Sequence, residues 1–218
     1  MASPVKSSRY VPAGGRAAFT GTYDLTMRLT MRERAWRGRL VRDVLEGGPT
    51  KVLDLGCGTG TLTVALEAAA PRLSVTGVDG DPEVLDRARA KAGAGSSIEW
   101  VQALAGALPF EDASFDRVVS SLLFHHLVPD AKRAALAEAR RVLRPGGRMH
   151  VADWGRPRDP AMAAAFFALR VVDGFENTRD HATGAFTAML ADAGFGDVRV
   201  EDRLRTAWGS LELLSARE

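Results

Sequence analysis

A chain of 218 residues is long enough for one domain with its own core, and 46% apolar with 26% charged residues is the composition of a globular protein. The formal net charge of only +2 disfavours a nucleic-acid-binding protein, because the pI near 9.0 reflects the use of arginine and not a cluster of excess cations. A single cysteine, Cys57, excludes an internal disulfide and a cysteine-rich metal site.

The N-terminal segment carries no sign of a targeting sequence. Residues 1–20 are interrupted by proline and glycine, lack the apolar stretch of a signal peptide, and are expected to form a loosely attached arm. The longest apolar run, at 161–169, is too short to span a bilayer. These features predict a cytoplasmic protein, and the abundance of alanine, glycine and arginine favours a bacterial source.

Apolar spacing then predicts a regular alternation of helices and strands. A helix is expected over 24–45, ended by Gly47-Gly48-Pro49. Strands are expected at 51–55, 73–78, 98–102, 115–123 and 148–152, with helices at 61–70, 82–91 and 130–142 between them. Helices at 161–172 and 185–193 and strands at 197–201 and 208–215 complete the chain. This order is typical of an α/β fold with a doubly wound, mostly parallel sheet covered by helices on both faces.

Glycines concentrate directly after the first strand, in Gly56-Cys57-Gly58-Thr59-Gly60. Glycine lets the backbone turn sharply and approach a ligand closely, and the following helix N-terminus favours electron-rich groups. Asp79 ends the next strand, where a carboxylate can accept hydrogen bonds from ribose hydroxyls. The Gly-x-Gly-x-Gly spacing differs from that of dinucleotide enzymes and no Lys-Ser/Thr pair of a P-loop follows. The pattern therefore predicts a nucleoside-containing cofactor.

These motifs together resemble the class I S-adenosylmethionine-dependent methyltransferases. The resemblance spans about residues 20–150 and rests on Asp54–Gly60, Gly77–Asp79, Leu108–Phe110, Phe115–Val119, His125–Leu127 and Arg141–Gly147. It is closest to the C-methyltransferases of ubiquinone and menaquinone biosynthesis and their small-molecule relatives. It implies a Rossmann-like sheet of seven strands with the last strand antiparallel, S-adenosyl-L-methionine as cofactor and S-adenosyl-L-homocysteine as product.

The resemblance also implies one domain over residues 1–218 with four parts. These are an N-terminal arm and lid helix (1–46), a cofactor-binding core (50–152), an inserted cap (153–184) and a C-terminal helix with strands (185–218). By position, the cofactor-binding residues would be Tyr23, Asp54, Gly56, Cys57, Gly58, Gly60, Asp79, Gly80, Leu104, Ala105 and Ser120. Asp54 would organise the loop and hold the cofactor amino group, Asp79 would bind the ribose, and Tyr23 would contact the cofactor from the lid.

One position departs from the family pattern. Relatives carry an aspartate four residues before the Leu-Pro-Phe motif, where it accepts a hydrogen bond from the adenine amino group, and this chain has Leu104 there. A leucine side chain has no acceptor. Gln102 or the backbone around Ala105 would have to recognise adenine instead.

Methyl transfer from a sulfonium requires the acceptor atom to lie in line with the bond between the methyl carbon and sulfur. It requires a base only when the acceptor is protonated. His125, His126 and Asp153 are the candidate catalytic residues, because they follow the strands at 115–123 and 148–152, at the sheet edge where open α/β folds bind ligands. Structural roles for the two histidines, and a turn role for Asp153, remain open alternatives. No metal site is expected.

The cap supplies the main indication of the acceptor. Seven apolar residues lie close together there: Met162, Phe166, Phe167, Leu169, Val171, Val172 and Phe175. They could form an apolar wall over a small aromatic or quinone-like acceptor, or simply a helix buried on the sheet. The arginine series Arg28, Arg32, Arg34, Arg37, Arg39 and Arg42 would be a solvated helix face or a peripheral contact with anionic lipid.

The sequence leaves other functions open. A phospholipid or other amine N-methyltransferase would also suit an apolar cap and an arginine-rich helix. A cyclase or a binding protein that holds S-adenosylmethionine without methyl transfer is a third interpretation. The expected partner is a small molecule and not a nucleic acid, with a monomer or homodimer and no stable membrane insertion.

Overall fold

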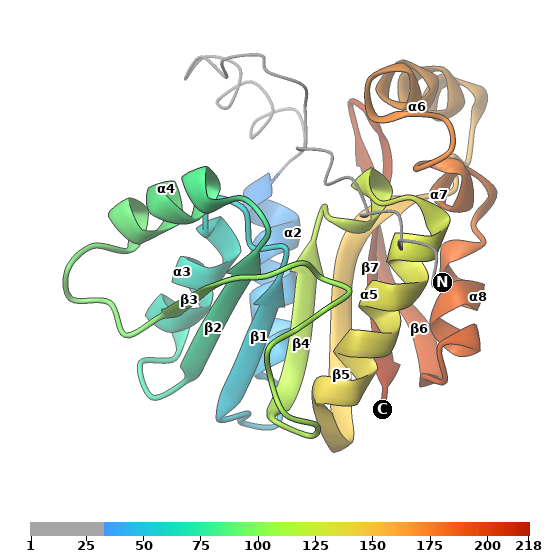
Figure 1. Cartoon of the computed structure of the whole chain (residues 1–218). Helices are drawn as coiled ribbons and strands as arrows, with labels where there is room; N and C mark the ends of the chain where they lie inside the picture. The colour runs from blue at the N-terminus through green and yellow to red at the C-terminus, as the bar shows by residue number, and fades with distance from the viewer. Residues whose placement is uncertain (1–32) are drawn as a thin grey trace, which may run out of the picture.

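The computed structural model describes residues 33–218, and this part of the chain folds around a seven-stranded sheet (Figure 1). The strands are β1 (Lys51–Leu55), β2 (Ser74–Asp79), β3 (Glu99–Gln102), β4 (Phe115–Ser121), β5 (Leu143–Gly155), β6 (Gly196–Thr206) and β7 (Gly209–Arg217). Their order in the sheet is β3-β2-β1-β4-β5-β7-β6. Pairing is parallel from β3 to β5, and β7 runs antiparallel to both of its neighbours. The predicted fold class is confirmed.

Helices connect and cover the strands. They are α2 (Glu33–Leu45), α3 (Thr61–Ala69), α4 (Pro82–Ala92), α5 (Pro129–Val142), α6 (Pro160–Asp173), α7 (Arg179–Thr183) and α8 (Phe186–Asp192), with a 3₁₀ turn η1 (Phe124–His126) after β4. Sequence signals explain several of these ends. The side chain of Asp81 accepts a hydrogen bond from the Glu83 N–H at 2.8 Å, and Pro82 occupies the first turn, as expected for the start of α4.

The two faces of the sheet bury separate sets of apolar side chains, because successive residues of a strand point to opposite faces. In β1, Val52 joins the cluster that contains Trp36 of α2, whereas Leu53 joins the cluster that contains Leu136 of α5 and Phe186 of α8. All five side chains are at least 97% buried. The helices therefore pack against the central strands from both faces of the sheet, and this packing fixes the positions of the strand ends.

The carboxyl ends of β1 and β4 form the centre of the fold. The chain runs from β1 outward to β2 and β3, then returns to the other side of β1 with β4. Ligands of open α/β sheets bind where the strand order reverses in this way. Two segments lie at this point: the glycine-rich loop that follows β1, and the segment of Leu122 to His126 that follows β4.

Four elements differ from the prediction. β5 extends over Leu143–Gly155, well beyond the expected 148–152, because the Pro145-Gly146-Gly147 segment forms an irregularity within the strand: Phe115 pairs with Leu143 and Arg117 with Arg148. β6 and β7 are longer than expected and form a hairpin that closes at the Thr206–Gly209 pair. The short helix α7 was not predicted.

The arginines of α2 are largely neutralised by neighbouring acids. Arg37 pairs with Glu33, Arg39 pairs with Asp202 of β6, and Arg42 lies 3.5 Å from Asp43. This arrangement favours the solvated-face interpretation over lipid contact. Arg28, Arg32 and the predicted helical residues 24–32 lie outside the described residues. Among the helices of residues 33–218, none combines the length and apolarity needed to cross a bilayer.

Candidate functional site

The glycine-rich loop is a compact turn held against the end of β2. Gly56, Gly58 and Gly60 have φ of 71°, 52° and 71°, the left-handed region that favours glycine. The N–H groups of Gly56 and Cys57 both donate to the Val78 carbonyl, at 2.8 and 2.9 Å. The loop is thus tied to β2 at its base, and α3 begins directly after Gly60.

Gly60 is the tightest position of the loop. A Cβ added there would lie 2.5 Å from the Trp100 ring and 2.9 Å from the Ala88 Cβ. We expect Gly60→Ala to lower the free energy of unfolding by about 2–4 kcal/mol through overpacking and backbone strain. Urea unfolding measures this, with Gly95→Ala as control, since a Cβ at Gly95 would meet nothing within 4 Å. Equal stability of the two variants would contradict this expectation.

Asp54 lies beneath the loop and is fully buried. Its Oδ2 accepts a hydrogen bond from the Thr63 hydroxyl at 2.6 Å, whereas Oδ1 is buried and has no hydrogen-bond partner among the described residues. Burial raises the pKa of Asp54 to about 7, although the Thr63 hydrogen bond opposes the shift. A buried acceptor without a partner is costly and therefore indicates a ligand group that donates to it.

Asp79 closes the loop from the side of β2. Its Oδ2 accepts from the Gly58 N–H at 2.9 Å and its Oδ1 from the Asp81 N–H at 3.0 Å. Burial raises the pKa of this carboxyl, and the backbone hydrogen bonds oppose the shift. Each oxygen keeps a further lone pair that a ribose hydroxyl could use.

The predicted adenine-binding residues lie together beside Asp79. The Ala103 N–H donates to the Asp79 carbonyl at 3.1 Å, which brings the end of β3 against the end of β2. The amide of Gln102 donates to the Gly80 carbonyl at 3.4 Å. Leu104 follows with a side chain that is 44% exposed, and Ala105 is half-buried. An exposed leucine side chain at this place can cover the face of a ring.

Two predicted residues have side chains committed to the fold. The Cys57 thiol is buried beside Gly77, and burial raises the pKa of this thiol, which keeps it neutral and unsuited to nucleophilic attack. The Ser120 hydroxyl is buried and donates to the Leu55 carbonyl at 2.9 Å. Either residue would contact a cofactor through its backbone. Tyr23 lies outside the described residues.

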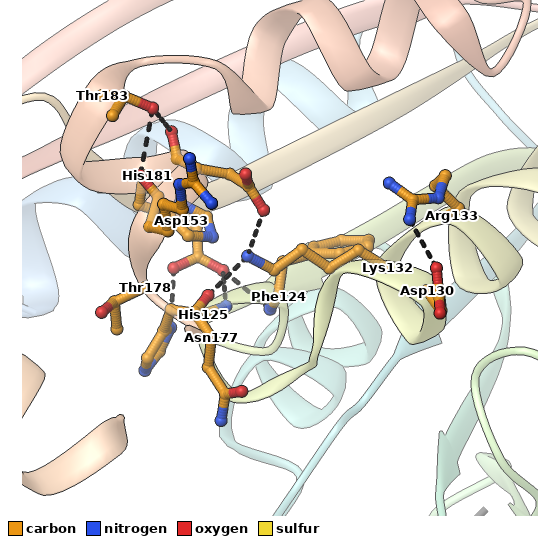
Figure 2. Close-up of polar contacts among 12 residues, drawn as sticks. Phe124, His125, Asp130, Lys132, Arg133, Asp153, Asn177, Thr178, His181 and Thr183 are labelled. Carbon is orange, nitrogen blue, oxygen red and sulfur yellow. Dashed lines mark hydrogen bonds and ion pairs between the residues drawn. The ribbon is translucent and has the colours of Figure 1, made fainter. Parts of the chain in front are cut away.

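The three candidate catalytic residues lie at the ends of β4 and β5. Figure 2 shows Asp153 pointing toward His125, and the His126 ring lies beside the His125 ring. His125 Nδ1 lies 2.7 Å from Asp153 Oδ1. The same carboxylate accepts backbone hydrogen bonds from Phe124 at 2.8 Å and from Trp154 at 2.7 Å. Burial opposes the ionisation of Asp153, but His125, His181 and these hydrogen bonds outweigh it and hold the pKa of the carboxyl well below its usual range. Asp153 is therefore an ionised group that orients His125.

His126 forms the open side of this cluster. Its ring centroid lies 3.9 Å from that of His125, and its Nδ1 lies 3.5 Å from Asp173 Oδ1 at the end of α6. Burial, assisted by the neighbouring His125, lowers the pKa of His126 to about 3, so the ring is neutral near neutral pH.

The structure adds three residues that sequence reasoning did not select as site residues. Asp173 closes the cluster from α6. His181 of α7 places its ring centroid 6.3 Å from that of His125, and burial lowers the pKa of His181 to about 4. Lys132 of α5 is buried and donates to the Asn177 carbonyl at 2.5 Å and to Asp180 at 3.1 Å. No local pattern marks these residues, because they meet only through the packing of the cap.

The seven apolar residues predicted for the cap lie in α6 and just after it, and only some of them are buried. Met162, Phe166 and Leu169 are buried, and Phe166 packs 6.0 Å from Trp154 between ring centroids. The remaining four are exposed, from 47% to 78%: Phe167, Val171, Val172 and Phe175. Three of the seven residues predicted for the apolar wall therefore belong to the core. In Figure 1, α6 stands at the top of the sheet above β7.

A separate cavity of about 490 Å³ lies away from this cluster, between α2 and strands β5 to β7. Its lining is charged, and Arg39 with Asp202 and Ser215 with Glu201 are paired across it. An apolar acceptor would gain little there. The glycine-rich loop and the group of His125, His126, Asp153, Asp173 and His181, called the histidine cluster below, remain the candidate site.

Comparison with known proteins agrees with this geometry. A family model described as a methyltransferase domain matches residues 52–147. The demethylmenaquinone methyltransferase of Deinococcus radiodurans is 36% identical over 153 residues, which are 69% of this chain and 63% of the relative. The enzyme of the same name from Thermus thermophilus is 40% identical over 147 residues, 66% of each chain. The match thus spans slightly less than two thirds of these relatives.

Solved structures support the fold. The N-methyltransferase NodS from Bradyrhizobium japonicum, in complex with S-adenosyl-L-homocysteine, has a TM-score of 0.65 at 21% identity and covers 88% of this chain and 90% of its own. A S-adenosylmethionine-dependent methyltransferase from Methanosarcina mazei has a TM-score of 0.63 at 23% identity, covering 82% and 96%.

The residues at the loop fit S-adenosylmethionine, the cofactor of these relatives. A Cβ added to Gly58 would meet nothing within 4 Å, so the loop leaves open space there, and the unpartnered Asp54 Oδ1 suits a donor such as an ammonium group. The sheet order, the loop, the acid at the end of β2 and the matching domain all agree. The chain contains a methyltransferase domain over residues 52–147, and its fold is that of S-adenosylmethionine-dependent methyltransferases.

Proposed function

We propose that this protein transfers a methyl group from S-adenosylmethionine to a small apolar acceptor with a phenol- or quinol-type ring. The observation that carries the proposal is the carboxylate-oriented His125 next to the glycine-rich loop. Leu123, two residues before His125, packs so closely on the loop that a Cβ on Gly56 would lie 2.7 Å from it. The cofactor loop and the histidine cluster are thus neighbours.

When bound, S-adenosylmethionine supplies an electrophilic methyl group on sulfur. The chain must then hold the acceptor in line and assist the loss of its hydroxyl proton. Ionised Asp153 fixes the His125 proton on Nδ1, so that Nε2 carries the free lone pair. Figure 2 shows the His125 ring extending away from Asp153. The Nε2 lone pair is the group of this cluster that can assist that proton loss.

Two observations support a ring-type apolar acceptor. The names of both curated relatives specify demethylmenaquinone as their acceptor. In this chain, the Trp154 ring lies 6.2 Å from the His125 ring between centroids, and the exposed rings of Phe167 and Phe175 in the cap contact each other at 5.5 Å. A planar acceptor could stack on such rings.

A methyl-transfer assay tests the proposal. The full chain is incubated with methyl-labelled S-adenosylmethionine and reduced demethylmenaquinone, with phosphatidylethanolamine vesicles, or without acceptor. We expect label in the quinol and an equal amount of S-adenosylhomocysteine, with neither in the other two samples. Label in the lipid amine alone would contradict the proposal, as would cofactor binding without product in any sample.

Leu104 allows a test of how the chain recognises adenine. Restoring an acceptor with Leu104→Asp should tighten S-adenosylmethionine binding by about fivefold, the effect of one added hydrogen bond of about 1 kcal/mol. Leu104→Ala is the control, because it removes the exposed side chain without adding an acceptor. Calorimetric titration measures both. Equal affinity in Leu104→Asp and wild type would show that Gln102 or the backbone already serves adenine.

A further inference from the structure

Three potential metal ligands converge at the mouth of the histidine cluster. The side chains of His125, His126 and Asp173 each offer one ligand atom, and these atoms lie within 4.8 Å of one another. His125 Nε2 is 3.9 Å from Asp173 Oδ2, and His126 Nδ1 is 3.5 Å from Asp173 Oδ1. Both separations are too long for good hydrogen bonds. A tetrahedral cation with bonds of about 2.1 Å holds its ligand atoms about 3.4 Å apart, close to the spacing found here.

The neighbouring residues hold these three groups in a ligating arrangement. Asp153 accepts a hydrogen bond from the Nδ1–H of His125 at 2.7 Å, which leaves Nε2 free to bind a metal. Metal-binding histidines are oriented in this way by a second carboxylate or carbonyl. The Asn177 amide donates to both the His126 carbonyl at 3.1 Å and the Asp173 carbonyl at 3.0 Å. This link ties η1 to the end of α6 and keeps His126 beside Asp173.

We propose that His125 Nε2, His126 Nδ1 and a carboxylate oxygen of Asp173 bind a divalent transition-metal ion. Two imidazoles and one carboxylate suit Zn²⁺, Mn²⁺, Fe²⁺ or Co²⁺, and such a set leaves coordination positions open. The half-buried His126 and Asp173 form the accessible side of the site.

The role of the ion rests on the proposed function. An acceptor hydroxyl would bind at an open coordination position through its oxygen. The cation lowers the pKa of that hydroxyl, the proton passes to water, and the O–H bonding electrons stay on the acceptor oxygen. The His125 Nε2 lone pair would then assist proton loss as a ligand of the bound ion and not by accepting the proton itself, with Asp153 and Asn177 as positioning residues.

Direct metal binding tests this proposal. The full chain is stripped with a chelator and then dialysed against Zn²⁺, Mn²⁺ or Co²⁺, with metal content measured by mass spectrometry and Co²⁺ ligation by visible absorption. We expect one ion per chain. Asp173→Asn and His126→Ala should each weaken binding at least about tenfold, since each removes one ligand. Glu176 is an exposed acid three residues after Asp173, and Glu176→Gln is therefore the matched control, which should bind the ion like wild type.

Circular dichroism shows whether each variant is folded, and calorimetry measures its cofactor binding independently. Failure of the wild type to retain any of the three ions would overturn the proposal, as would unchanged affinity in a folded Asp173→Asn variant. Full methyl transfer by stripped protein that binds no ion would overturn the metal proposal and leave the proposed function supported. Ion binding without methyl transfer to any acceptor would support the metal site and contradict the proposed function.

Discussion

Asp54→Asn is expected to weaken S-adenosylmethionine binding at least about tenfold while stabilising the protein without cofactor. The reason is the same for both effects: Asp54 holds a buried carboxylate whose Oδ1 has no partner among the described residues. Asparagine keeps an oxygen that can accept from Thr63 but removes the charge that would pair with a cofactor ammonium group. Asp86→Asn, on the exposed face of α4, is the control and should change neither quantity.

The stability effect should depend on pH in a defined direction. The pKa of Asp54 rises from 3.8 to about 7 on folding, so the folded state favours the protonated carboxyl. That contribution is complete below about pH 4 and is lost as the pH rises through about 7. Above that window, Asp54→Asn should be more stable than wild type by at most about 4 kcal/mol. Urea unfolding at about pH 4 and about pH 8 measures the difference. If the stability difference between Asp54→Asn and wild type is the same at both pH values and cofactor affinity is unchanged, the role given to Asp54 is contradicted.

Asp153→Ala should produce the largest loss of stability and activity at the histidine cluster. The variant leaves the buried N–H groups of Phe124 and Trp154 without their acceptor and releases His125 from its fixed orientation. We expect the free energy of unfolding to fall by about 3–5 kcal/mol and methyl transfer to fall by about 10²- to 10⁴-fold. Asp192→Ala, an exposed acid at the end of α8, is the control for both measurements.

The contribution of Asp153 to stability depends on pH with the opposite sign to that of Asp54. The folded-state pKa of Asp153 lies below its ordinary value, so its contribution to stability is present above about pH 4 and is lost as the pH falls further. The stability difference between wild type and Asp153→Ala should therefore shrink in acid. Thermal unfolding at about pH 7 and about pH 3 measures this change. A difference that stays constant would mean that Asp153 does not act as an ionised acceptor.

Local signals were sufficient to predict most of the fold. The apolar run at 51–55, the glycine-rich loop and the Asp81-Pro82 helix start are each set by a few adjacent residues, and each lies where the pattern placed it. The length of β5 could not be predicted in this way. Pro145-Gly146-Gly147 is a pattern that normally ends regular structure, and only pairing with β4 shows that the strand continues through it.

The site was predictable only in part, for the same physical reason. His125, His126 and Asp153 could be selected because they follow strands at one edge of a parallel sheet. Asp173 and Asn177 could not, because they approach His126 only after α6 folds back over the sheet edge. The two histidines also could not be told apart from sequence: His125 is held by Asp153, and His126 faces Asp173.

A crystal structure of the full chain with S-adenosyl-L-homocysteine bound tests the assigned cofactor site most directly. It should place the ribose on Asp79, the amino group near Asp54 Oδ1 and the sulfur on the side of the loop that faces His125 and His126. A product molecule with its sulfur turned away from η1, or bound in the charged cavity between α2 and β6, would contradict the assignment of this site.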